Sequence, residues 1–164
     1  MIAVALLLVS CSTSKDAGTT TQSSEKMALG WLHRSDFVTP EYPLFGENYD
    51  SAHIEPQFVD MIHRLQDGIE VVVVFGTWCG DSKQNVPRFL KLADLASIPS
   101  ERIRFYGVDR SKKSSDGVTE RYHIERVPTF IFLKNGNEVG RIVESPKHSM
   151  EDDVLAILAD AMNK

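Results

Sequence analysis

The stretch VVVVFGTWCGDSKQNVPRFL, residues 71–90, contains the most informative pattern in the sequence. It continues an uninterrupted run of mostly β-branched residues that starts at Ile69 and ends at Phe75. Such a run is typical of a strand buried on both faces of a sheet. Helical spacing of apolar residues begins a few positions later, so the sequence predicts Cys79 at the junction between a buried strand and a helix.

The remaining elements follow from the same kind of patterning. That helix is expected over 81–96, where Pro87 should kink it. The other expected elements are a helix at 55–65, a strand at 102–108, a short helix at 118–122, strands at 130–133 and 139–143 joined at Asn135-Gly136, a helix after Ser149, and an N-terminal edge strand around 31–37. This order predicts an α/β fold with a mixed central sheet and helices on both faces.

Composition narrows the function. The chain has 164 residues, 42% of them hydrophobic and 25% charged, as in an ordinary globular protein. Its net charge of -5 argues against general nucleic-acid binding, which requires a basic surface. The five histidines are scattered without metal-ligand spacing, so no metal or other cofactor is expected. We expect a monomer.

The first residues indicate export. Residues 1–10 contain an apolar run that is too short to span a bilayer and suits a signal peptide. Leu8-Val9-Ser10-Cys11 resembles a bacterial lipobox, which predicts lipidation of Cys11. The alternative is a plain secretory peptide with an incidental cysteine. We favour the lipoprotein because cysteine is scarce here and this one stands where the motif requires it.

A tether is expected after the anchor. Residues 11–26 are rich in serine and threonine and nearly free of apolar side chains, so they cannot bury a core. The folded domain is therefore predicted at 27–164. Ser12, directly after the lipidated cysteine, is compatible with the outer membrane, and we expect the domain to face the periplasm of a bacterial cell envelope.

Two separated motifs carry a family resemblance. Trp78-Cys79-Gly80 is followed by a proline eight residues after the cysteine, and RYHIERVPTFIFLKNG follows at 121–136. In both motifs the chain resembles thioredoxin-like proteins, whose hallmark is Trp-Cys-Gly-Pro-Cys. The resemblance covers about residues 55–164 and implies a thioredoxin-like fold with Pro128 in the cis form after Val127.

The departures from that pattern matter equally. Ser82 stands where the family has its second, resolving cysteine, and Asp81 replaces the proline. Val73 occupies the position of a buried aspartate that often manages the proton of the second cysteine. The sequence therefore indicates a single-thiol variant.

The resemblance also assigns site residues. Cys79 would be the nucleophile at a helix N-terminus, whose unpaired N–H groups favour a thiolate. Ser82 could donate a hydrogen bond to it, and the cis-Pro128 loop would lie against it. The implied catalytic residues are Cys79, Ser82 and Pro128, and the implied substrate-binding residues are Trp78, Gly80, Asp81, Val127 and Thr129.

Three functions fit these residues. The first is an envelope-anchored thiol–disulfide exchange protein, which forms mixed disulfides through Cys79 with thiol- or disulfide-containing envelope proteins or small thiols. The second is a non-catalytic module that binds an extended peptide by β-augmentation at Val127. The third is a sensor in which the cysteine is oxidised to sulfenic acid.

Overall fold

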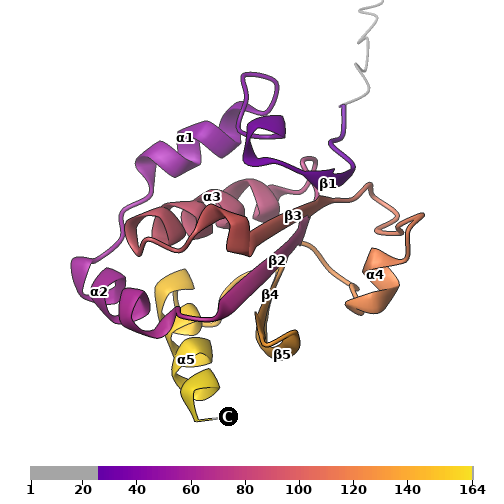
Figure 1. The fold of residues 1–164 in the computed structure, drawn as a ribbon. Coiled ribbons are helices and arrows are strands. Elements are labelled where there is room, and N and C mark those ends of the chain that lie inside the picture. The colour runs from indigo at the N-terminus through magenta and orange to yellow at the C-terminus, as the bar shows by residue number, and fades with distance from the viewer. Residues whose placement is uncertain (1–25, 164) are drawn as a thin grey trace, which may run out of the picture.

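The computed structural model describes residues 26–163, and its centre is a five-stranded mixed sheet (Figure 1). The strands lie in the order β1-β3-β2-β4-β5. Their bounds are Gly30–Leu32 (β1), Ile69–Phe75 (β2), Ile103–Gly107 (β3), Thr129–Lys134 (β4) and Asn137–Val143 (β5). Only β2 and β3 pair in parallel, and the other neighbours are antiparallel.

Helices cover both faces of this sheet, as predicted. The α-helices are Pro43–Ser51 (α1), Pro56–Leu65 (α2), Gly80–Leu95 (α3), Val118–Arg121 (α4) and Met150–Met162 (α5), and 3-10 turns lie at Arg34–Asp36 and Ser100–Arg102. Figure 1 shows α4 on one side of the sheet and the other four helices on the opposite side. The short α4 leaves its face more thinly covered.

The alternation of β2 side chains creates two cores. Val71, Val73 and Phe75 point to the larger cluster, which contains the phenylalanines of α1, α3, β3 and β4. Val72 and Val74 point to a smaller cluster on the α4 side. All β2 residues except Glu70 are therefore buried, which explains why its sequence lacks polar alternation.

Most predicted elements are confirmed, β2 with its full bounds. The N-terminal edge strand exists but is only three residues long, and it pairs antiparallel with β3. Helix α1 was not predicted. Among the residues of α1 only Phe45 is fully buried, and Gly46 interrupts any apolar stripe, so periodicity gave no signal there.

The predicted signal peptide, the lipidation site at Cys11 and all of the predicted tether except Lys26 lie outside the described residues. Within 26–163, no helix combines the length and the apolar character that a membrane crossing requires.

Candidate functional site

Cys79 is the N-cap of α3, at the predicted strand-to-helix junction. Its backbone N–H donates to the carbonyl of Gly76 at 3.0 Å, and its own carbonyl accepts from the N–H of Lys83 at 3.0 Å. The side chain is partly exposed. A sulfur in this position lies beside the unpaired N–H groups of the first helical turn.

The loop before β4 supplies the partner of that sulfur. The Val127–Pro128 peptide bond is cis, as predicted. The Sγ of Cys79 donates to the carbonyl oxygen of Val127 at 3.3 Å. The Thr129 hydroxyl turns back to the carbonyl of Arg126 at 2.7 Å, which closes the loop. The structure thus brings Cys79 and the cis-proline loop together, although 48 residues separate Cys79 from Val127.

Trp78 forms a fixed wall beside the cysteine. Its indole Nε1 donates to the carbonyl of Val108 at 2.8 Å. The ring lies so close to Gly76 that a Cβ there would be 2.5 Å from Nε1. The guanidinium of Arg110 lies 4.9 Å from the ring centroid. The structure thus places a cation against this aromatic wall.

Ser82 lies differently from the expectation. Its side chain is fully buried, and its hydroxyl accepts a hydrogen bond from the Gly76 N–H at 3.3 Å. Within 26–163, no hydrogen bond joins Ser82 Oγ to Cys79 Sγ, so the expected donation to the sulfur is absent. Gly80 and Asp81, the two residues after Cys79, are exposed, and Val73 is fully buried in the larger core.

Two further residues of the site were missed by sequence reasoning. Asn85 lies on the buried face of α3, and its side-chain amide donates to the Glu144 carbonyl at 3.0 Å and to Ser145 Oγ at 3.3 Å. The N–H of Glu144 donates to the carbonyl of Pro128 at 2.7 Å. A polar residue directly before the apolar stripe of α3 was the available signal for Asn85.

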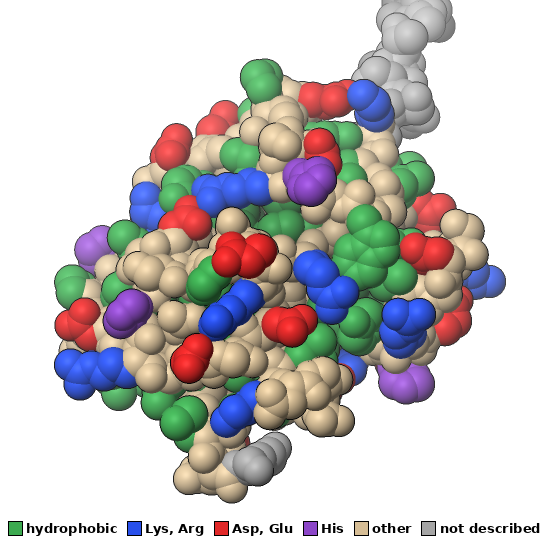
Figure 2. Space-filling view, viewed as in Figure 1, with side chains coloured by type: hydrophobic (Ala, Val, Ile, Leu, Met, Phe, Trp, Pro, Cys, Tyr) green, Lys and Arg blue, Asp and Glu red, His purple; other side chains and the backbone are tan. Residues whose placement is uncertain are grey.

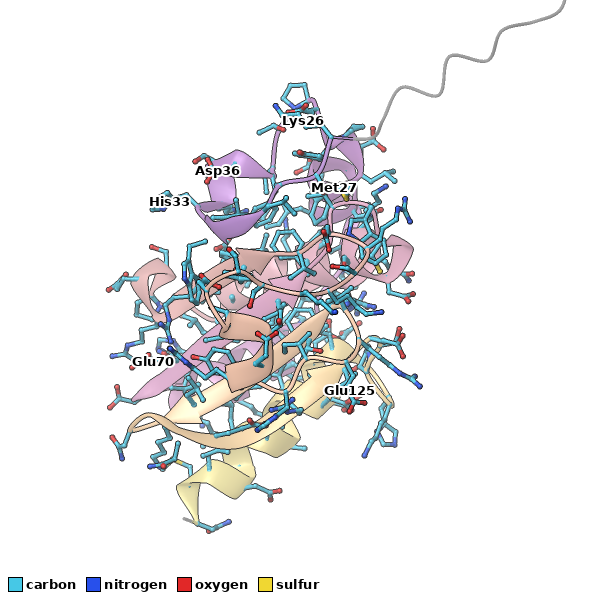
Figure 3. The ribbon with its side chains drawn as sticks, turned by 90° about the vertical axis from the view of Figure 1, so that its right-hand side faces the viewer. Lys26, Met27, His33, Asp36, Glu70 and Glu125 are labelled. Carbon is cyan, nitrogen blue, oxygen red and sulfur yellow. The ribbon has the colours of Figure 1, made fainter. Side chains whose placement is uncertain are left out.

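A polar hollow of about 510 Å³ lies next to the cis-proline loop. Its lining residues are His123, Glu125, Arg126, Thr129, Arg141, Val143 and Glu144. A second hollow, of about 500 Å³, is lined by His33 among others. Figure 3 shows His33 and Glu125 far apart, so the two hollows are separate and only the first adjoins the loop.

Charge is distributed evenly on the face seen in Figure 2, where acidic and basic side chains are interspersed without a large single-sign patch. Metal-ligating residues are also dispersed: in the described part of the chain no three histidine, cysteine, aspartate or glutamate side chains gather into a metal site.

The chain is similar to known thioredoxins. A family profile described as Thioredoxin matches residues 44–157. The chain is 33% identical to a thioredoxin of Malassezia sympodialis over 51% of its own length and 78% of that protein. It is 34% identical to thioredoxin H9 of Arabidopsis thaliana over 57% of its length and 63% of that protein.

Solved structures agree on the fold. A Pseudomonas aeruginosa protein of unknown function superposes with a TM-score of 0.59 at 15% identity, over 81% of this chain and 93% of the other. The segment that the family profile matches, residues 44–157, contains both the cysteine junction and the cis-proline loop. With the profile covering well over half of its residues, the chain belongs to the thioredoxin family.

Proposed function

We propose that this protein is a thiol–disulfide exchange protein that acts through the single thiol of Cys79. The thioredoxin-like fold is consistent with this chemistry in general terms. The observation that carries the proposal is the position of the sulfur: it is partly exposed at the N-terminus of α3 and in hydrogen-bond contact with the cis-proline loop.

Thiol–disulfide exchange at Cys79 involves no net oxidation or reduction. Cys79 loses its proton and attacks one sulfur of a substrate disulfide, forming a Cys79–substrate disulfide while the other substrate sulfur leaves as a thiolate and takes up a proton. A second thiol, from the substrate or from a small molecule, then attacks the mixed disulfide and frees Cys79. Since Ser82 provides no second sulfur, rearrangement or removal of small-thiol caps suits this site better than net reduction.

We also propose that the protein acts at a bacterial envelope membrane. Lipidation at Cys11 would anchor the protein to a bacterial envelope membrane, with the outer membrane and the periplasmic side as our choice. Its partners would then be thiol- or disulfide-containing envelope proteins or small thiols. Labelling cells with a radioactive fatty acid tests the anchor: label should enter the wild-type chain and be lost in Cys11→Ser.

Trapping tests the activity. The protein is isolated from its native envelope after thiol blocking and without reductant, and species joined to Cys79 are identified by mass spectrometry. A discrete set of mixed disulfides is expected, and Cys79→Ser, which keeps the shape of the site, should give none. The second candidate, a non-catalytic binding module, would be supported if Cys79→Ser retained the same partners non-covalently and kept function in cells.

A further inference from the structure

Glu144 has an unusual backbone conformation directly beside the cis-proline loop. Its φ is 61°, in the left-handed region that residues other than glycine rarely adopt. Such conformations persist only when surrounding contacts hold them, and they cluster at functional sites. The contacts of Glu144 therefore show what holds this residue in place.

Glu144 is contacted by one residue of α3 and by two residues of the cis-proline loop. Asn85 on α3 holds the Glu144 carbonyl, and the Glu144 N–H holds the Pro128 carbonyl. The Glu144 carboxylate pairs with the Arg126 guanidinium at 2.7 Å. We call Asn85, Arg126 and Glu144 the clamp, because they tie the cis-proline loop to the helix that carries Cys79.

We infer that the clamp positions the cis-proline loop for exchange with extended polypeptide disulfides, an inference that rests on the function proposed above. The loop carbonyl of Val127 already contacts the Cys79 sulfur, so a displacement of the loop would change the surface on which an extended substrate lies. A small reagent needs only the sulfur and would not depend on that surface.

The contacts of the clamp indicate that it positions the cis-proline loop more than it stabilises the whole domain. Asn85 is 6% exposed, and a buried amide is tolerated only when its hydrogen bonds are made. The Arg126–Glu144 pair is instead well exposed, with side-chain exposures of 65% and 39%, and exposed pairs contribute little to folding. Its effect should therefore be local, on the loop that contains Arg126.

The test compares two reagents on the full chain. Iodoacetamide measures the accessibility of the sulfur alone. A short peptide whose cysteine carries thionitrobenzoate measures exchange, because attack by Cys79 joins the peptide to the protein and releases the coloured thiolate. The variants are Asn85→Leu and Glu144→Gln. Their matched controls are Asn48→Leu and Glu138→Gln. Asn48→Leu removes a side-chain hydrogen bond from α1 to the Lys83 carbonyl, and Glu138→Gln breaks a 2.6 Å ion pair within β5, the strand that ends directly before Glu144.

The ratio of the peptide rate to the iodoacetamide rate decides the outcome. We expect Asn85→Leu to lower it about fivefold, the effect of one typical hydrogen bond, and Glu144→Gln about twofold, as for an exposed pair. Both controls should keep the wild-type ratio. Should Asn85→Leu unfold, Glu144→Gln decides alone, because loss of an exposed pair leaves the fold intact.

The contrary results are distinct. A reactive wild type with an unchanged ratio in the variants, or an equal fall in the controls, overturns the role of the clamp and leaves the proposed function standing. A wild type that reacts with neither reagent overturns the proposed function and this inference with it.

Discussion

At the scale of single residues, the site depends on a close approach between Gly76 and Trp78. The indole lies across the glycine backbone and is fixed by its hydrogen bond to Val108. No other residue type fits at position 76 without moving the ring, which is the wall next to Cys79.

Gly76→Ala should therefore destabilise the protein. The added methyl group would overlap Trp78, and overpacking of this kind costs about 1–3 kcal/mol. Urea unfolding measures the change, and tryptophan fluorescence reports the displaced indole. Gly46→Ala is the control: it lies in α1 with open space around its Cα, so helix propensity predicts a gain of about 0.5–1 kcal/mol. Equal stability of Gly76→Ala and the wild type would contradict the packing argument.

Ser82 has a structural role that can be measured apart from catalysis. Its hydroxyl is the acceptor for the buried Gly76 N–H. Ser82→Ala leaves that donor unpaired and should lower the free energy of unfolding by about 1–3 kcal/mol. Ser82→Cys, which retains a weak acceptor, should lose less. If Ser82→Ala leaves the free energy of unfolding unchanged in a denaturant titration, this hydrogen bond contributes nothing to stability.

At the scale of elements, the sequence predicted what local chemistry determines. The β-branched run fixed β2, and Ser149 before three acidic residues predicted the start of α5, where its hydroxyl indeed accepts from the Asp152 N–H. Helix α1 was not predicted because Phe45 is its only fully buried residue and so gives no apolar periodicity. The clamp was not predicted for another reason. Asn85 and Glu144 are 59 residues apart in the sequence, and no local sequence pattern indicates the positive φ of Glu144.

The cap of α5 gives a direct test at this scale. Ser149→Ala removes the acceptor of the Asp152 N–H and should cost about 1 kcal/mol. Ser149→Asp, which restores an acceptor, should recover most of the loss. Thermal unfolding followed by circular dichroism measures both, and an unaffected Ser149→Ala would exclude the cap as a stabilising contact.

Tyr106 on β3 should make the free energy of unfolding depend on pH. Burial, and then its 2.7 Å hydrogen bond to Asp116, raise the pKa of Tyr106 to about 12. The folded state thus holds the phenol proton more tightly than the unfolded state, so this contribution is present below about pH 10 and is lost as the pH rises towards 12.

Tyr106→Phe supplies the comparison. The wild type should lose stability between pH 10 and 12 more steeply than the variant, as measured by urea unfolding across that range. The same hydrogen bond lowers the pKa of Asp116, so its contribution is present above the usual aspartate range and is lost in acid, as the pH falls through that lowered pKa. Parallel alkaline profiles would contradict the assignment.

At the scale of the whole molecule, the domain has two cores on one sheet. The site and clamp residues come from the turn before α3, from α3 itself, from the cis-proline loop and from the residue directly after β5. The fold itself could be predicted because two separated motifs, at Cys79 and Pro128, agreed. The polar contacts across the core could not be predicted, because they depend on how the backbone packs and not on residue spacing along the chain.

A chain of residues 27–164 should therefore fold like the full protein. We expect the same midpoint of thermal unfolding and the same iodoacetamide rate at Cys79, because both cores lie within the shortened chain. A fall in the midpoint of more than about 4 °C, roughly 1 kcal/mol for a domain of this size, would show that the removed residues contribute to the fold.

The first described residues run alongside the reactive turn. The N–H of Ala28 donates to the hydroxyl of Thr77 at 3.3 Å, and Thr77 is only two positions before the nucleophile. Two residues span at most about 7 Å. If Cys11 carries a lipid, the anchored end of the chain therefore joins the domain beside the reactive turn, and bulky folded clients would find their approach restricted on that side.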